Sequence, residues 1–295
     1  MYELIPSGEN TYYMDCPAKV GIVRTGAGRG VLIDGGSDGD AAKKVLKLLD
    51  QLGLTLDAVY CTHSHADHIG GCHLLQQRTG CKVYLPPEEL GFADTPILEP
   101  AFLYGGRPPK VLRNKFLMAP SCQAEPLTPE ALPDGFSMRL VGGHSFSMAL
   151  LKTPDDVWFV GDAVAAEETL AKYPVSYLND VDEFLQALDV LLTLEGRQFI
   201  PAHAPVCSDL AHLVEVNRAN TLQLCALLKD ICAVPSTFEE ILKAVFDRLG
   251  HTLNWIQYVL VGCTLRSYLS SMLDKGELVT LIQENRLLWS LPEAG

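Results

Sequence analysis

Four potential metal ligands lie within six consecutive positions of the chain. The segment 62–68 reads Thr-His-Ser-His-Ala-Asp-His and supplies the side chains of His63, His65, Asp67 and His68. Neutral imidazole and carboxylate groups are suitable ligands for zinc and related divalent metals. A single histidine is more often packed or solvated than a ligand, but four ligands in this order favour a metal site.

The residues around this segment place it at the end of a strand. An apolar stretch at 56–61 precedes it, and Gly70-Gly71 follows it, where the backbone can turn tightly. Three further candidates follow strand-like apolar runs at 137–141, 157–160 and 198–200, and these are His144, Asp162 and His203. We therefore expect several strands to end in potential ligands.

Strands that alternate with helical patterns indicate a layered α/β fold. Runs at 20–24 and 30–34 read as a hairpin, and a helix with apolar positions 45, 48, 49 and 52 follows. A strand at 81–85 and a helix at 184–192 continue the pattern. Segment 86–136 contains ten prolines and reads as a loop-rich excursion, a kind of insertion that often serves as a lid or binding loop.

From about residue 208 the pattern is helical. We expect helices at 210–228, 238–249, 252–261 and 264–274, then a β-hairpin around the turn Gln283-Glu284-Asn285. Helices followed by a hairpin resemble a winged helix-turn-helix. We therefore predict a catalytic domain at 1–207 and a small, winged-helix-like domain at 208–295, which covers the mouth of the site or forms a homodimer contact.

The composition narrows the class of protein. The 295 residues are 48% hydrophobic, which suits one large domain with or without a small appendage. Lys and Arg number 23 against 36 Asp and Glu, and the net charge of −13 disfavours nonspecific nucleic-acid binding. The cysteines form no Cys-x-x-Cys pair and the first residues lack a signal-peptide pattern, which predicts reduced thiols in the cytoplasm. No apolar run approaches the ~20 residues of a membrane span.

Taken together, these motifs resemble the metallo-β-lactamase superfamily over residues 2–207. The resemblance is carried by His63-Ser64-His65-Ala66-Asp67-His68, Gly143-His144, Gly161-Asp162 and Ala202-His203. Within this superfamily, the chain is similar to the glyoxalase II-type hydrolases. Its C-terminal segment resembles that of the β-lactamase-like protein 2 endoribonucleases. The resemblance implies an αββα four-layer sandwich with the metals at one edge, between the two sheets. Asp34 matches an early aspartate that braces the site.

The same resemblance implies two divalent ions, with zinc as the first candidate and iron or manganese as alternatives. Carried over position by position, His63, His65 and His144 hold metal one, Asp67, His68 and His203 hold metal two, and Asp162 bridges both. A water or hydroxide between the metals completes the site, and two cations lower its pKa toward neutrality. Asp67 can accept a hydrogen bond from this nucleophile, so Asp67 and Asp162 are expected to act in catalysis.

The residues that contact the substrate carry weaker signals. Phe146 follows His144 at a place where the superfamily commonly has small residues, and its bulk changes the wall near metal one. Candidate lid residues in the excursion and pocket residues after the bridging aspartate are Phe102, Tyr104, Arg107, Tyr173 and Tyr177. The tyrosines either line the pocket or pack in the core. Arg107 pairs with a substrate carboxylate or with a surface acid.

The complete ligand set favours a hydrolase of a small-molecule thioester, ester or lactone, and it disfavours a non-enzymatic module. Among relatives, β-lactamases lack the bridging aspartate, and flavo-diiron proteins carry Glu at the position of His65. A mononuclear iron persulfide dioxygenase shares the His-x-His-x-Asp-His spacing and stays an alternative. A phosphodiesterase or endoribonuclease is the other alternative. The charge of the C-terminal segment disfavours this alternative, because residues 221–295 contain six Lys and Arg against eight Asp and Glu. A nucleic-acid-binding helix should present a basic face, and the predicted helix at 264–274 has Arg266 as its one basic residue.

Overall fold

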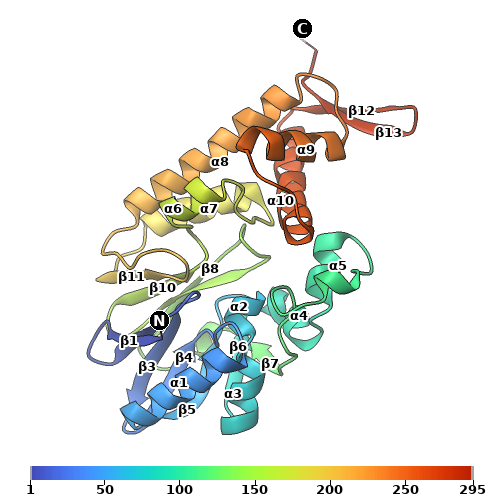
Figure 1. The fold of residues 1–295 in the computed structure, drawn as a ribbon. Helices are drawn as coiled ribbons and strands as arrows, with labels where there is room; N and C mark the ends of the chain where they lie inside the picture. The colour runs from blue at the N-terminus through green and yellow to red at the C-terminus, as the bar shows by residue number, and fades with distance from the viewer. Residues whose placement is uncertain (1, 294–295) are drawn as a thin grey trace.

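Two β-sheets face each other in the computed structural model of the protein, which describes residues 2–293 (Figure 1). The first sheet contains, in spatial order, β1 (Glu3–Pro6), β2 (Thr11–Asp15), β3 (Val20–Gly26), β4 (Arg29–Ile33), β5 (Thr55–Tyr60), β6 (Lys82–Leu85) and β7 (Ala124–Pro126). The second contains β11 (Gln198–Pro201), β10 (Val157–Gly161), β9 (Met148–Lys152) and β8 (Ser137–Val141). Strands β4 to β7 run parallel to one another, and β10 runs parallel to β11.

Helices cover the outer faces of both sheets, which gives the four layers that the sequence predicts. On the first sheet lie α1 (Gly39–Leu52) and α3 (Cys72–Thr79), and on the second lie α7 (Val181–Leu192) and α8 (Ala211–Ile231) (Figure 1). The space between the sheets is filled by a buried cluster that includes Val31, Tyr60, Phe159 and Ile200. Burial of these apolar faces is what holds the two sheets together.

The predicted strands before the candidate ligands are confirmed. Strands β5, β8, β10 and β11 end one to three residues before His63, His144, Asp162 and His203. The hairpin of β3 and β4 is also confirmed, whereas β1, β2 and β9 lie outside the predicted strands. In β9 the run Met-Ala-Leu-Leu is buried on both faces, so it lacks the alternation that marks a half-exposed strand.

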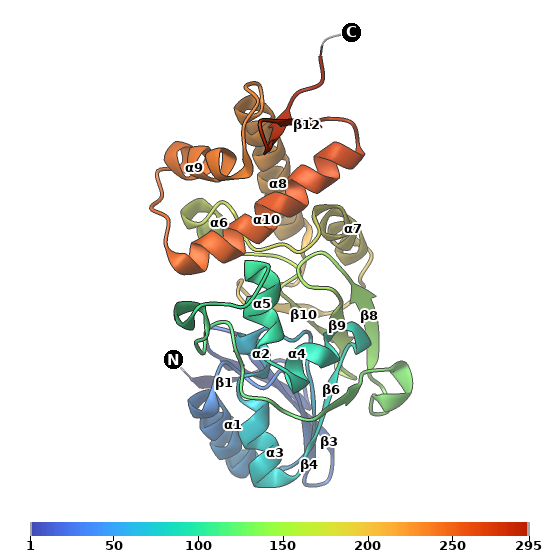
Figure 2. The same cartoon turned by 90° about the vertical axis from the view of Figure 1, so that its right-hand side faces the viewer.

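The excursion at 86–136 contains more regular structure than a long loop. It begins with η1 (Pro87–Glu89), α4 (Leu90–Asp94) and α5 (Leu98–Tyr104), and continues through η2 (Lys110–Leu112), β7 and η3 (Pro129–Ala131). Strand β7 pairs with β6, which returns the chain to the first sheet. Helix α5 lies beside α10 (Trp255–Asp274), as Figures 1 and 2 show. The excursion therefore reaches from the sheet to the C-terminal helices.

The C-terminal region contains α8, α9 (Phe238–Leu249), α10 and a hairpin of β12 (Val279–Gln283) and β13 (Arg286–Ser290). The prediction of two helices at 252–261 and 264–274 is wrong, because α10 runs through both segments without a break. Gly262 is tolerated within α10, since Val261, Leu265 and Leu269 around it bury one continuous apolar face. The predicted hairpin is confirmed, and the winged-helix assignment stays a prediction.

The predicted domain boundary at 207/208 falls between β11 and α8. One buried cluster continues across it, from Val160 and Phe184 in the sandwich to Leu228, Leu242 and Leu269 in the C-terminal helices. These helices therefore share a hydrophobic core with the second sheet, and the boundary itself stays a prediction. The nine cysteines are all free thiols. Within residues 2–293, none of the helices combines the length and the apolar character of a membrane span.

Asn217 on α8 should contribute strongly to stability. Its buried side chain accepts a hydrogen bond from the Ala165 amide and donates to the carbonyls of Ala165 and Leu213. We expect Asn217→Ala to lower the free energy of unfolding by about 1–3 kcal/mol, because buried peptide groups lose their partner. Urea denaturation measures the loss. Gln223→Ala, at an exposed position of the same helix, is the control and should change stability by less than ~0.5 kcal/mol; equal losses in both variants would contradict this role.

Candidate metal centre

Four strand ends meet at one edge of the sandwich. Strands β4 and β5 are parallel in the first sheet, and β10 and β11 are parallel in the second, so each pair ends at the same edge. The residues that follow these four ends are Asp34, His63, Asp162 and His203. The Gly161 carbonyl accepts a hydrogen bond from the Ala202 amide (2.8 Å), which holds the ends of β10 and β11 side by side.

His144 reaches the same edge through a glycine turn. Gly143 has a φ of +99°, and a β-carbon at this position would lie 2.2 Å from the Phe184 backbone nitrogen. The Gly143 carbonyl accepts hydrogen bonds from the amides of Asn179 and Asp180, just before α7. Because only glycine fits this close approach and this backbone conformation, the turn is pinned to α7 and presents His144 to the histidines after β5.

The first ligand group consists of His63, His65 and His144. The Nδ1 atom of His65 lies 2.9 Å from Nε2 of His63 and 3.0 Å from Nε2 of His144. Burial lowers the pKa of His65 and of His144 to about 4, and it holds the pKa of His63 well below its usual value. The three imidazoles are therefore neutral at pH 7, which is the form that binds a metal.

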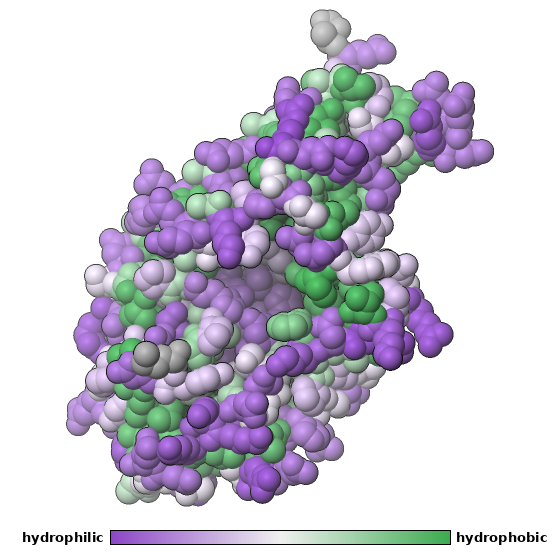
Figure 3. All heavy atoms as spheres, viewed as in Figure 1, coloured by the Kyte–Doolittle hydropathy of each residue, from purple (hydrophilic) through white to green (hydrophobic). Residues whose placement is uncertain are grey.

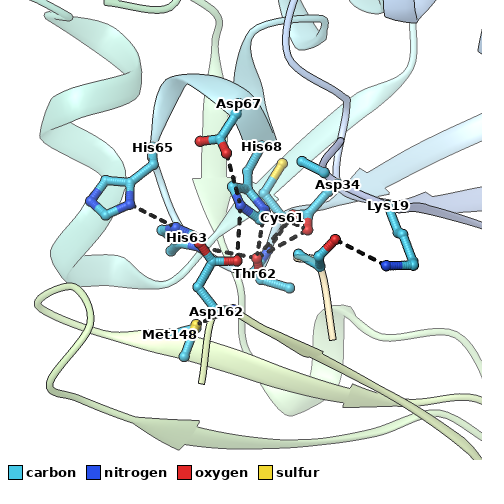
Figure 4. A network of polar contacts seen from close by, with 12 residues as sticks. Lys19, Asp34, Cys61, Thr62, His63, His65, Asp67, His68, Met148 and Asp162 are labelled. Carbon is cyan, nitrogen blue, oxygen red and sulfur yellow. Dashed lines mark hydrogen bonds and ion pairs between the residues drawn. The ribbon is translucent and has the colours of Figure 1, made fainter. Parts of the chain in front are cut away.

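The second ligand group consists of Asp67, His68, Asp162 and His203. The Nε2 atom of His203 lies 2.9 Å from Asp67 Oδ2 and 3.5 Å from Asp162 Oδ2. Asp162 Oδ1 lies 3.3 Å from His68 Nε2, and Asp162 Oδ2 lies 3.4 Å from His144 Nε2. The Asp162 carboxylate therefore contacts both groups, and Figure 4 shows it facing His63 and His68 from the opposite sheet.

Two buried polar atoms in these groups lack a hydrogen-bond partner among the described residues. They are Nε2 of His68 and Oδ1 of Asp162, which face each other without hydrogen-bond geometry. Unpaired buried polar atoms are rare in folded proteins, and a cation between these two would satisfy both. Imidazole and carboxylate form the donor set that zinc, iron and manganese accept. The residues present therefore fit divalent metal ions.

The comparison with known families agrees with this geometry. The chain matches the family model of the metallo-β-lactamase superfamily over residues 13–203. The chain belongs to the metallo-β-lactamase superfamily. A β-lactamase-like protein 2 homolog from Drosophila melanogaster is 24% identical over 225 residues, which cover 72% of this chain and 65% of that protein. A hydroxyacylglutathione hydrolase from Serratia proteamaculans is 42% identical over 62 residues, which span only 21% of this chain and 23% of that enzyme.

Solved structures share the metallo-β-lactamase fold over nearly the whole chain. A β-lactamase domain protein from Burkholderia ambifaria has a TM-score of 0.75 and 17% identity, covering 98% of this chain and 94% of that one. A metallo-β-lactamase family protein from Thermus thermophilus has a TM-score of 0.71 and 21% identity, covering 98% and 97%. At these identities the likeness shows the fold alone. The shared fold includes the helical C-terminal region.

In this metallo-β-lactamase fold, Asp34 lies beside His68 on the side away from Asp162 (Figure 4). The buried Asp34 carboxylate accepts hydrogen bonds from Nδ1 of His68 (2.9 Å) and from the Thr62 amide (2.7 Å). Asp34 has a φ of +65°, a conformation that is uncommon for residues other than glycine. A proton held on His68 Nδ1 leaves Nε2 free to bind a metal. The structure thus places Asp34 where the sequence predicts a bracing residue.

His203 is oriented in the same way by the backbone. Its Nδ1 lies 2.6 Å from the Pro17 carbonyl, so Nε2 faces the second ligand group. The Lys19 ammonium donates to the carbonyls of Ala204 and, at longer range, Ala202 and Pro201. Segment 17–19 therefore holds the loop that carries His203.

Sequence reasoning missed Glu89, which ties two histidine loops together. Its carboxylate is buried and accepts hydrogen bonds from the Ser64 amide (3.1 Å), the Ser64 hydroxyl and the Ser147 amide (3.1 Å). Sequence reasoning also missed Glu99 on α5, whose Oε1 lies 3.8 Å from His65 Nε2. Burial raises the pKa of Glu99 to about 8. Both residues belong to the excursion, whose sequence pattern marks neither of them.

The face of the molecule seen in Figure 3 is hollowed near its centre. A cavity of about 210 Å³ lies beside the ligand groups and is lined, beyond the ligands and Ala66, by Glu99, Phe116, Leu117, Tyr177 and Leu260. Figure 3 shows hydrophobic side chains gathered on one side of the hollow. This cavity is the mouth of the metal centre, and within residues 2–293 its lining includes acidic residues but no Lys or Arg.

The residues predicted to contact the substrate lie at different distances from the centre. The Tyr177 ring is 5.3 Å from the His65 ring and 5.7 Å from the His144 ring, centroid to centroid. Phe102 and Phe146 form a partly exposed pair at 5.1 Å. Tyr104 and Tyr173 line other cavities, with Trp255 and with His251 respectively. Arg107 is exposed and outside the described lining of the mouth.

Glu89→Gln should lower both stability and metal content. The amide group turns a donor toward a backbone N–H that needs an acceptor, and such a mismatch costs about 1–3 kcal/mol. The loops of His63–His65 and His144 then lose their common anchor. Metal analysis and thermal denaturation measure the two effects. Glu88→Gln, at the exposed neighbouring position, should leave both unchanged; an unaffected Glu89→Gln protein would refute this role.

Metal binding at pH 7 should release protons. The charge of Asp162 raises the pKa of His203 to about 9 in the metal-free protein, so His203 is protonated below that pH and must lose its proton to bind a metal. Zinc affinity should therefore increase as the pH rises toward 9. Calorimetric titration with zinc in buffers of different ionisation enthalpy counts the protons. His203→Asn should release about one proton fewer than the wild type; release that is the same in both proteins would contradict the assignment.

Proposed function

We propose that the protein is a dinuclear-metal hydrolase that cleaves a small-molecule thioester, ester or lactone. The observation that carries this proposal is the position of Asp162, whose carboxylate oxygens lie 3.3–3.5 Å from nitrogens of both ligand groups. One ion would be held by His63, His65 and His144, and the other by Asp67, His68 and His203, with Asp162 shared. Zinc is the first candidate for both ions, and iron or manganese are the alternatives.

The chain's own residues would orient the reactants. Divalent cations bound here supply a water of lowered pKa and stabilise negative charge that develops on the carbonyl oxygen. The Asp67 side chain is 42% exposed toward solvent, so its carboxylate oxygen that does not bind the metal can accept a hydrogen bond from the attacking water. In the reaction the water oxygen bonds to the acyl carbon, the C–S or C–O bond breaks, and a water proton passes to the leaving group.

The charge of the mouth supports an uncharged acyl substrate over a phosphodiester. Asp67 lines it as a carboxylate, and Glu99 is mostly protonated at pH 7 because its pKa is about 8. The described lining contains no lysine or arginine to pair with phosphates. Nucleic-acid binding depends on such cations, and the whole chain carries a net charge of −13. The hydroxyacylglutathione hydrolases among the relatives act, by name, on an acylated thiol. This likeness covers the chain only in part, so it supports the reaction type and leaves the substrate to experiment.

His65→Ala and Asp162→Ala should each abolish hydrolysis and lower the metal content. His65→Ala removes one ligand of the first group, whereas Asp162→Ala removes the carboxylate shared by both. Elemental analysis gives the metal-to-protein ratio, and a thioester assay gives kcat/KM. His212→Ala, which removes an exposed histidine paired with Glu167, is the control and should keep full activity. Full activity in either ligand variant would exclude this centre as the site of hydrolysis.

A substrate panel separates the proposed hydrolase from the other two activities that share the ligand pattern. Purified protein is tested on uncharged thioesters, esters, lactones, phosphodiesters and RNA, with its metal content measured in the same sample. Turnover of the carbonyl substrates is expected. Selective cleavage of RNA would favour an endoribonuclease, and iron together with oxygen consumption on a persulfide would favour a dioxygenase.

A further inference from the structure

A second cavity lies behind Tyr177, outside both ligand groups. It measures about 260 Å³ and lies between the loop at 173–177 and the helices α9 and α10. Tyr173 and Val175 face it from the loop, and Val245, Leu249 and Val261 face it from the helices. Val245 and Val261 are buried, so the wall that the helices contribute to this cavity belongs to the hydrophobic core.

This cavity adjoins the mouth of the metal centre. Tyr177 and Leu260 line both spaces. The Tyr177 ring stands nearly edge-on to His144, at an interplanar angle of 89°, and packs with Leu260 beside the buried Leu117. These two side chains form the wall shared by the mouth and the second cavity, so a chain that reaches the cavity from a carbonyl at the ligand groups must pass between or beside them.

We propose that this cavity binds the apolar acyl group of the substrate, an inference that rests on the proposed hydrolase function. Aliphatic and aromatic side chains dominate its lining, so an alkyl chain gains from leaving water there. Across residues 2–293, the lining of both spaces contains no lysine or arginine that would hold a terminal carboxylate or phosphate. The substrate class is thus an uncharged thioester, ester or lactone with a hydrophobic acyl chain.

The cavity also limits the length of that chain. The rings of Tyr173 and His251 stack at 6.4 Å at one part of its wall, which joins the loop to the segment after α9. Tyr173 is 47% exposed, so this pair marks the end of the cavity nearest to solvent. Methylene groups that stay on the inner side of this pair are buried, and those beyond it return to water.

The test uses a series of straight-chain acyl thioesters of one small uncharged thiol, from acetyl to dodecanoyl. With the wild type, kcat/KM should rise by about fourfold for each buried methylene and then level off once the cavity is full. Leu249→Trp fills the cavity from the end of α9 and should lower the octanoyl-to-acetyl ratio of kcat/KM by at least tenfold. Leu192→Trp, at an exposed leucine on α7, is the matched control and should leave that ratio unchanged.

A binding measurement separates this inference from the proposed function. Decan-2-one cannot be hydrolysed, and calorimetry should show that it binds the wild type and binds Leu249→Trp at least tenfold more weakly. Hydrolysis of the acetyl thioester with no effect of chain length and no ketone binding would overturn the acyl cavity and leave the hydrolase standing. Selective ketone binding without turnover of any acyl substrate would overturn the hydrolase and leave an apolar binding site. Equal loss of binding in Leu249→Trp and Leu192→Trp would also overturn the acyl cavity.

Discussion

The apolar packing between the two sheets is the constraint on which the metal centre depends. The ligands come from segments as far apart as residues 63 and 203, and no local interaction brings them together. The buried cluster of Val31, Tyr60, Phe159 and Ile200 sets the separation of the sheets just behind their common edge. Because interiors of this kind are packed as densely as crystals, the positions of His63 after β5 and Asp162 after β10 are defined before any ion binds.

Burial then divides the ligands into two electrostatic classes. For the imidazoles of the first group, the effect of burial on the pKa outweighs that of the nearby carboxylates, so these imidazoles stay neutral at pH 7. The second group mixes carboxylates with imidazoles, and the charges of Asp162 and its neighbours raise the pKa of His68 and of His203. In the metal-free protein these protons balance the buried carboxylates. A metal ion that replaces these protons supplies the same positive charge next to the carboxylates. The side chains of the centre can therefore hold their positions before the ion binds.

The sequence predicted the parts of the centre whose signals are local. The density of ligands at 63–68 and the apolar runs before His144, Asp162 and His203 are each visible within a few residues. Glu89 and Glu99 were missed because their contacts with Ser64, Ser147 and His65 exist only after the excursion folds onto the sheet edge. The prediction of two helices at 252–261 and 264–274 was wrong because the apolar face that α10 buries along its whole length is decided by tertiary packing.

Part of the wall of the mouth comes from elements that carry none of the proposed ligands. Leu103 on α5, Leu117 in the excursion and Val259 on α10 form one buried cluster, and Tyr177 packs against it. This cluster contains none of the proposed ligands, yet it positions the side chain that contacts the rings of His65 and His144. Changes within it can therefore reshape the space for a substrate while the sheets keep the ligands in place. Such a division allows one centre to serve different substrates, because chemistry is tied to the rigid strand ends and recognition to the helices and loops above them.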